Sequence, residues 1–377
     1  MSYLVHNGRI VTFNNNPVYT SIPNFNIGSG PNNFVNDIYV MPDDSLILGG
    51  DFTSYNGVAR NYYCKVSPSG VLDSTFATIG LTAGGPMTIQ MDSSGRFLIG
   101  GFFNMVDGST RNFFARTNTN GSLDTTFYAG TGFNANVRGI LIRPDNSLIV
   151  VGNFTTFDSS TKGRIVGLTS NGQLNTNFNT GSGFNNLTLS VRAHPSGNIV
   201  VGGNFTTYKG VNTYRMTMLD NSANTVPSFS IGTGFDAAVF DIKVHDDGKI
   251  VAVGNFNNFN GQPCSKMARL NADGTLDCSF GVFNADLRNV TITSNNKYVV
   301  SGLFVTHNDV SVGSIIAFNY DGTVYSKFNT NKGFNARTIV TRAQSTGKIV
   351  VGGQFVSFND VSTNYITRLR MDGVIDR

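Results

Sequence analysis

The chain has 377 residues, enough for one large repetitive domain or two ordinary domains with a sizeable core. It contains 30 Phe, 13 Tyr and 43 Gly but no Trp, and this aromatic content excludes an intrinsically disordered chain. The net charge of +4 is small and evenly spread, which argues against a nucleic-acid groove or a membrane-binding face. We therefore expect no nucleic-acid partner.

Residues 1–20 precede the repeat described below and carry their own turn signals. Asn7-Gly8 stands between two runs that alternate apolar and polar residues, which predicts a hairpin. This short preface resembles the N-terminal segments that anchor some bacteriophage virion proteins. The alternative is that it adds an edge strand to the last sheet. The alternation over residues 1–13 fits neither a secretion signal nor a membrane span, so we expect synthesis in the cytosol without membrane insertion.

A glycine followed two residues later by phenylalanine recurs along the rest of the chain. The phenylalanines are 51 residues apart, except for one interval of 48. The pairs are Gly50/Phe52, Gly101/Phe103, Gly152/Phe154, Gly203/Phe205, Gly254/Phe256, Gly302/Phe304 and Gly353/Phe355. A second phenylalanine series with the same period runs from Phe25 to Phe328. The period predicts seven structural repeats over residues 21–377.

Each repeat reads as strands. Its first segment alternates apolar and polar residues, as in Val35–Val40, and a turn such as Pro42-Asp43-Asp44 follows. An apolar run that ends at the motif glycine, as in Leu46–Gly50, predicts a buried second strand. After a loop of about ten residues, Tyr62–Val66 predicts a third strand. Each unit is thus an antiparallel meander of three or four strands.

One such sheet cannot cover both of its apolar faces, so the units must pack face to face. Seven of them close naturally into a ring, and we predict an all-β fold, a seven-bladed β-propeller. The last unit ends before an eighth phenylalanine of the second series, whereas Ser21–Phe25 is the piece that it lacks. We therefore expect the last blade to be closed by N-terminal residues. The motif glycines predict a close backbone approach, and the motif phenylalanines predict packing between blades.

The segments Gly248–Phe256, Ala268–Asp277 and Gly232–Phe235 resemble the delta-60 repeat family, a domain of unknown function assigned to β-propellers. The resemblance covers residues 21–377. It implies the propeller fold, and it implies no catalytic or binding residues, because the family offers none to transfer.

Two sets of positions are candidate binding surfaces. Aromatic residues, with one histidine, recur three positions after the motif phenylalanine and predict a ring of side chains on one face, suited to a glycan or a protein. These are Tyr55, Phe157, Tyr208, Phe259, His307 and Phe358. The alternative is that they cap the blade core. A first-strand position that includes Arg192, Lys243 and Arg342 predicts a channel lining that is basic on one side.

Catalytic and metal-binding motifs give no positive signal. His194 and His245 occupy equivalent positions but lack a third ligand type, so we expect no metal and no cofactor. The three cysteines have unrelated spacings, which argues against disulfides or zinc. The sequence favours a non-enzymatic structural or interaction propeller, a phage virion or tail-associated protein that attaches to other virion subunits. Two alternatives stay open: a carbohydrate- or receptor-binding module that uses the aromatic ring, and a polysaccharide hydrolase or lyase.

Overall fold

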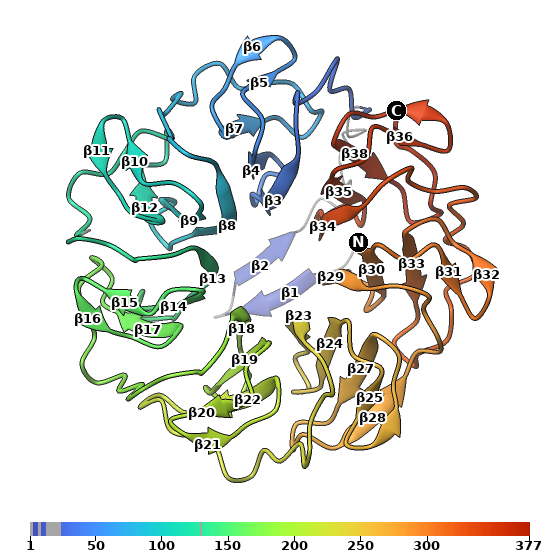
Figure 1. The fold of residues 1–377 in the computed structure, drawn as a ribbon. Coiled ribbons are helices and arrows are strands. Elements are labelled where there is room, and N and C mark those ends of the chain that lie inside the picture. The colour runs from blue at the N-terminus through green and yellow to red at the C-terminus, as the bar shows by residue number, and fades with distance from the viewer. Residues whose placement is uncertain (1–2, 7–8, 13–23, 129) are drawn as a thin grey trace.

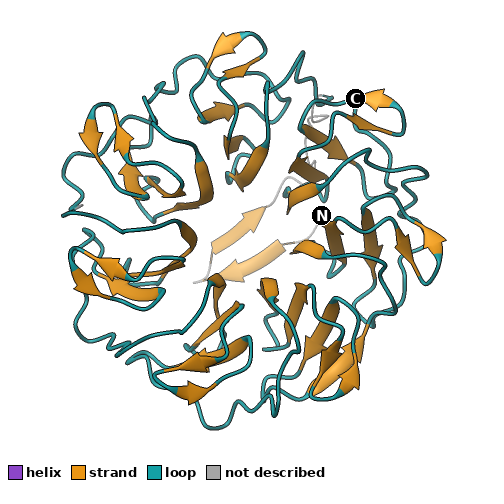
Figure 2. Cartoon of the chain, in the orientation of Figure 1, coloured by secondary structure: helices purple, strands orange, loops and turns teal. Residues whose placement is uncertain are grey.

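The computed structural model describes residues 3–6, 9–12, 24–128 and 130–377. All regular structure in this part of the chain is β-strand, arranged as small sheets around a central axis (Figure 1, Figure 2). The sheets, in chain order, have the strand orders β3-β4-β7, β8-β9-β12, β13-β14-β17, β18-β19-β22, β23-β24-β27-β28, β29-β30-β33 and β34-β35-β38. Pairing is antiparallel throughout.

The first strand of each sheet lies nearest the axis (Figure 1). These strands are β3 (Val35–Val40), β8 (Pro86–Met91), β13 (Val137–Ile142), β18 (Thr188–Ala193), β23 (Val239–Val244), β29 (Leu287–Ile292) and β34 (Thr338–Ala343). Each contacts the first strand of the next sheet, and β34 contacts β3, so the array is a closed ring.

The second strands are buried along their whole length, as the apolar runs predict. They are β4 (Leu46–Gly50), β9 (Phe97–Gly101), β14 (Leu148–Gly152), β19 (Ile199–Gly203), β24 (Ile250–Gly254), β30 (Tyr298–Gly302) and β35 (Ile349–Gly353). The third strands are β7 (Tyr63–Val66), β12 (Phe114–Thr117), β17 (Ile165–Leu168), β22 (Met216–Leu219), β27 (Met267–Leu270), β33 (Ile315–Phe318) and β38 (Ile366–Leu369).

A fourth strand is present as β28 (Leu276–Ser279), and elsewhere it shrinks to a single bridge such as Val66↔Leu72. The segment between the second and third strands, expected to be a plain loop, holds a two-stranded ribbon in every unit. The ribbons are β5/β6 (Ser54–Tyr55, Val58–Ala59), β10/β11 (Met105–Val106, Ser109–Thr110), β15/β16 (Thr156–Phe157, Ser160–Thr161), β20/β21 (Thr207–Tyr208, Val211–Asn212), β25/β26 (Asn258–Phe259, Gln262–Pro263), β31/β32 (Thr306–His307, Val310–Ser311) and β36/β37 (Ser357–Phe358, Val361–Ser362).

The core is divided into clusters that each join two consecutive sheets. One cluster contains Phe52 and Val35 of the first unit together with Val350 and Ile366 of the last. The motif phenylalanines Phe52, Phe103, Phe154, Phe205, Phe256, Phe304 and Phe355 are all 0% exposed. Their burial removes large apolar surfaces from water at each junction between sheets, and this holds neighbouring sheets together.

The motif glycines lie opposite a β-bulge at the start of each first strand, as in the register shift between Val35 and Asp37. A Cβ added at Gly254 would lie 2.0 Å from the carbonyl oxygen of Ala238, and at Gly353 it would lie 2.5 Å from that of Arg337. Contact with backbone at these distances leaves no room for a side chain. The same clash, with the carbonyl oxygen of the residue before the first strand, occurs at Gly50, Gly101, Gly152, Gly203 and Gly302.

The two chain ends meet in the ring. The outer bridge of the last sheet, Leu369↔Ile375, comes from the C-terminal segment itself. The N-terminal segment then continues the path, because the N–H of Phe25 donates to the carbonyl oxygen of Asp376 at 3.2 Å and that of Asn26 donates to Ser69 at 2.8 Å. The N-terminal residues therefore supply the connection between the last and first sheets rather than a strand.

Residues 3–6 and 9–12 form a separate pair of strands. β1 (Tyr3–His6) pairs antiparallel with β2 (Arg9–Thr12), and among the described strands they pair only with each other. The alternative that the N-terminal residues add an edge strand to the last sheet is therefore wrong for β1 and β2. In the view of Figure 1 the hairpin crosses the centre of the ring.

Candidate functional site

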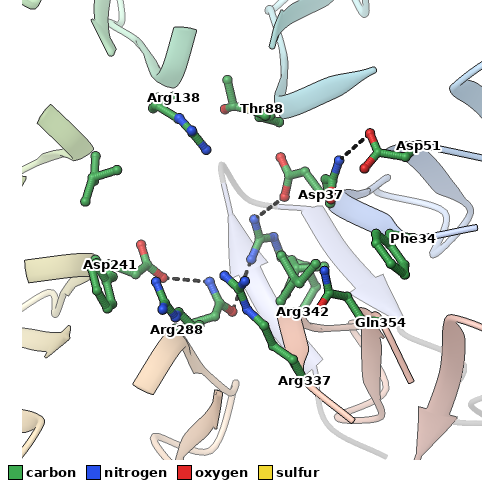
Figure 3. A pocket seen from close by; sticks show the side chains of 18 of the residues that line it. Phe34, Asp37, Asp51, Thr88, Arg138, Asp241, Arg288, Arg337, Arg342 and Gln354 are labelled. Atoms are coloured by element: carbon green, nitrogen blue, oxygen red, sulfur yellow. Dashed lines mark hydrogen bonds and ion pairs between the residues drawn. The ribbon is translucent and has the colours of Figure 1, made fainter. Parts of the chain in front are cut away.

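A cavity of about 390 Å³ lies on the ring axis, and we call it the arginine cavity (Figure 3). It is built from the second residue of every first strand, because the β-bulge turns this residue toward the axis. The residues at this position are Asn36, Met87, Arg138, Leu189, Phe240, Arg288 and Ile339, and all of them line the cavity. Further side chains come from Phe34, Asp37, Asp51, Asp241, Arg337 and Gln354.

A second axial cavity, of about 310 Å³, has a more aliphatic lining. The structure places the three predicted channel residues here. Lys243 lines this second cavity, and Arg192 and Arg342 line both cavities, as does Gln90. Gln90, Arg192 and Arg342 therefore lie between the two cavities along the axis.

A belt of polar contacts joins the first strands from β18 through β23, β29, β34 and β3 to β8. Asp37 accepts a hydrogen bond from the N–H of Ile89 at 2.8 Å, and Asn289 accepts one from the N–H of Thr341 at 2.9 Å. Arg342 continues the belt from β34 to β3, since its Nη2 lies 2.5 Å from Asp37 Oδ1. The belt thus links the last sheet to the first.

Asp241 is the most heavily bonded member of this belt. Its carboxylate lies 2.6 Å from Arg192 Nη2 and accepts a hydrogen bond from Asn289 Nδ2 at 2.8 Å. Lys243 Nζ is 3.8 Å away. Burial by itself would raise the pKa of Asp241, but the positive charges of Lys243, Arg192 and Arg342 outweigh burial and lower this pKa.

Burial shifts the pKa values of Asp37 and Lys243 in the directions that favour their neutral forms. Burial raises the pKa of Asp37 despite the opposing charge of Arg342. Burial, reinforced by the charge of Arg192, lowers the pKa of Lys243 to about 7. Burying these charged groups therefore carries a desolvation penalty, which the ion pairs between them offset.

Three arginines of the arginine cavity differ from this paired set. Arg138 lies in β13, Arg288 in β29, and Arg337 directly before β34, and each has a buried Nε without a hydrogen-bond partner among the described residues. Sequence reasoning missed them. A strict two-residue alternation places position 39 and its equivalents on the axis, and only the bulge adds the position of Arg138 and Arg288.

The predicted aromatic binding ring is wrong. Tyr55, Phe157, Tyr208, Phe259, His307 and Phe358 are 0–5% exposed. Their side chains complete the core above the motif phenylalanine, where the hydroxyl of Tyr208 donates to the carbonyl oxygen of Ala223 at 2.8 Å. The first residue of each ribbon projects outward and the second projects inward, because side chains alternate along a strand, and this second residue is Val106 in the ribbon β10/β11. These residues stabilise the fold and offer no surface to a ligand.

The two equivalent histidines also have structural partners. His194 Nε2 lies 3.0 Å from the carbonyl oxygen of Gly248 in the next sheet, and His245 packs edge-on against Tyr298 and Tyr320. Among the described residues no group of three His, Cys, Asp or Glu side chains is placed to hold a metal ion. The same part of the chain contains no helix that could span a membrane.

Comparison with protein families identifies the repeat. The family described as "Domain of unknown function (DUF5122) beta-propeller" matches residues 42–76, 93–127, 143–178, 194–217, 245–280 and 344–377, more than half of the chain. The chain belongs to this family. The DUF5122 matches begin at the turn after the first strand, and four of the six end at the second phenylalanine series, so each contains the buried second strand and the motif glycine.

Solved structures support the propeller fold of this DUF5122 protein. The WD40 beta propeller domain of Doa1 aligns with a TM-score of 0.60 at 14% identity, over 90% of this chain and 93% of that one. The extracellular domain of the putative hybrid two-component system BT3049 from B. thetaiotaomicron aligns with a TM-score of 0.52 at 13% identity. That alignment covers 88% of this chain and 39% of the other. A search of curated proteins gives no significant match.

Proposed function

We propose that this chain is a seven-bladed β-propeller that acts as a non-enzymatic attachment module for a protein partner. The single observation that carries the proposal is that the strands β1 and β2 pair with no described strand of the ring. Phe25 completes the junction between the last and first sheets, whereas β1 and β2 pair only with each other among the described strands. A ring that closes without its N-terminal hairpin leaves that hairpin for contact with another molecule.

Exposed aliphatic side chains on the last two sheets support a protein partner. Leu303, Val305 and Val310 of one unit and Val356 and Val361 of the next are 37–65% exposed. At the position of Val305 and Val356 the other units carry polar residues: Thr53, Asn104, Thr155, Thr206 and Asn257. Exposed apolar side chains on neighbouring sheets are a feature of protein interfaces.

The axial carboxylates favour a structural role over hydrolysis. A glycoside hydrolase needs one carboxylic acid and one carboxylate that face the substrate. Asp37 and Asp241 instead each accept hydrogen bonds from an arginine and from a backbone N–H of the next sheet. Their oxygens are engaged in joining the sheets, which supports a scaffold rather than a catalyst.

For the partner we propose another subunit of a phage virion or tail, on the resemblance of residues 1–20 to the anchoring segments of virion proteins. The test is to supply tagged full-length chain and a chain lacking residues 1–20 to cells that produce the particles, and to count tagged copies per purified particle. We expect the truncated chain to be lost from particles while its melting temperature stays unchanged. Equal incorporation of the two chains would show that the hairpin does not attach the ring.

A second pair of variants tests the aliphatic surface. Val305→Thr with Val356→Thr places on the last two sheets a residue found at the same position in other units. Val58→Thr with Val211→Thr is the matched control, because these exposed valines lie on ribbons of other sheets. We expect only the first pair to reduce incorporation, and a reduction by the control pair alone would contradict the proposed surface.

A further inference from the structure

The arginine cavity holds positive charge that the protein itself does not neutralise. Of the five arginines that line it, Arg192 and Arg342 form ion pairs with the lining carboxylates of Asp241 and Asp37 at 2.6 and 2.5 Å. Arg138 and Arg337 form no ion pair and no side-chain hydrogen bond with any other residue that the structure describes. The two sets of arginines in this cavity therefore differ in whether a carboxylate pairs with them.

Arg288 is the third arginine of the cavity whose buried Nε lacks an acceptor among the described residues, although it also forms an ion pair with Asp286. Its guanidinium lies 4.1 Å from the ring of Phe240 and its Nη2 is 3.1 Å from Asp286, but its Nε is buried without an acceptor. Arg138 projects from one wall of the cavity, and Arg288 and Arg337 project from the opposite side (Figure 3). Three guanidinium groups thus present donors to the same space.

Leaving these donors unpaired is unfavourable. A buried N–H group without an acceptor lowers the stability of the fold, and like charges that face each other lower it further. Burial lowers the pKa of Arg337, and the charges of Arg288 and Arg138 lower it further, with Asp286 opposing them. Burial also lowers the pKa of Arg138. An anion between the three side chains would relieve both effects.

We propose that the arginine cavity binds a small molecule through an oxyanion, a carboxylate or a phosphate, held between Arg138, Arg288 and Arg337. Its volume, about 390 Å³, is within the usual range for small-molecule sites. Guanidinium groups suit this ligand because their planar donor pairs match the oxygens of a carboxylate or phosphate. This proposal is independent of the attachment function.

The rest of the ligand contacts neutral and acidic groups. Asp51, Asn36 and Gln354 line the same cavity, and Asn36 Nδ2 donates to Asp51 Oδ1 at 3.2 Å. A carboxylate on this wall repels a second anionic group and accepts hydrogen bonds from hydroxyls. The ligand class is therefore a small hydroxylated molecule with one anionic end, such as a sugar acid or a sugar phosphate, rather than a polyanion.

The test is calorimetric titration of the full chain at low ionic strength with three probes: glucuronate, glucose 6-phosphate and uncharged glucose. We expect saturable binding of one or both anionic probes and none of glucose. The comparison of the two anions distinguishes a carboxylate from a phosphate ligand. Absence of saturable binding of both anions to the wild-type chain would overturn the proposal, and this measurement requires no variant to fold.

Arg138→Gln and Arg337→Gln should each weaken binding about 10–100-fold, the loss expected for a charged hydrogen bond. Arg111→Gln is the matched control, since Arg111 also has a buried, unpartnered Nε but lies beside the outer ribbon strand β11. Its affinity should equal that of the wild type. Equal weakening by all three substitutions, or none by any, would place the bound anion elsewhere and overturn the assignment.

Discussion

The backbone N–H of Phe25 donates a hydrogen bond to the carbonyl oxygen of Asp376 at 3.2 Å, although the two residues stand at opposite ends of the chain. In the middle of the chain the same bond is a local turn, from Phe127 to Asp124 at 3.4 Å and from Phe178 to Asn175 at 3.3 Å. Phe25 thus occupies the place of the phenylalanine that would follow residue 376 by three positions. The ring is therefore closed by a hydrogen bond between the chain ends that reproduces a contact found within other repeats.

Phe25→Ala should lower the free energy of unfolding by about 3–5 kcal/mol, because it removes a buried ring that packs between the last and first sheets. Phe76→Ala, at the same repeat position between two sheets joined by the chain, should cost a similar amount. Phe102→Ala is the control, since this ring is 46% exposed, and it should change the free energy by less than about 1 kcal/mol. Urea denaturation measures all three. A cost for Phe25 as small as that for Phe102 would show that closure does not depend on this contact.

Gly254→Ala should destabilise the protein by about 3 kcal/mol or force the bulge to rearrange, since the new Cβ would lie 2.0 Å from the carbonyl oxygen of Ala238. Gly80→Ala is the control, because the nearest atom to its Cβ is 3.5 Å away. Thermal and urea unfolding of both variants check the difference. Equal stability of the two variants would refute the close approach at the motif glycine.

Tyr208→Phe should lower the free energy of unfolding by about 1–3 kcal/mol, because the buried carbonyl oxygen of Ala223 loses its donor. Tyr128→Phe removes an exposed hydroxyl that donates to Asp158 at 2.6 Å, and it should cost less than about 0.5 kcal/mol. The measurement is denaturant unfolding of each variant. A stability-neutral Tyr208→Phe would weaken the conclusion that the ribbon aromatics serve the core.

Lys243→Met should change how stability depends on pH. The pKa of Lys243 is about 7 in the folded chain, below that of an unfolded lysine, so between pH 7 and about 10 the unfolded chain holds a proton that the folded chain lacks. Stability contributed by this group therefore rises with pH over that window, at about 1.4 kcal/mol per pH unit at most. We expect the free energy of unfolding of the wild type, relative to Lys243→Met, to rise between pH 7 and pH 10.

The control for this titration is Lys332→Met, because the Lys332 side chain is 74% exposed. Its difference from the wild type should stay flat over the same range, because Asp360 raises the pKa of Lys332 and the ammonium stays protonated in the folded chain, as it does in the unfolded chain. Urea denaturation at a series of pH values gives both differences. A flat difference for Lys243→Met as well would mean that the ammonium stays protonated in the folded ring, held by Asp241.

Much of this architecture could be read from local patterns. The bounds of the first strand Val35–Val40 and the second strand Leu46–Gly50 match the alternating and apolar runs, because burial of one or both faces imposes those patterns on a strand. The ribbon Ser54–Tyr55 with Val58–Ala59 was not predicted, since two-residue strands are too short to carry a periodic signal. Tyr55 was predicted to be exposed because the strand that turns its side chain inward was not predicted.

The sequence by itself determined the repeat, the meander in each unit and the chain ends that complement each other, because a fixed period records the same packing environment again and again. The sequence also indicated that Arg192, Lys243 and Arg342 face the axis, but only the tertiary structure showed that Arg138, Arg288 and Arg337 do so as well. The β-bulge breaks the alternation at the second residue of each first strand and turns Arg138 and Arg288 inward. Arg337 meets them from a unit far along the chain, and no spacing encodes that meeting, since it depends on how the ring curves. The cavity and its unpaired charge therefore exist only in the closed ring.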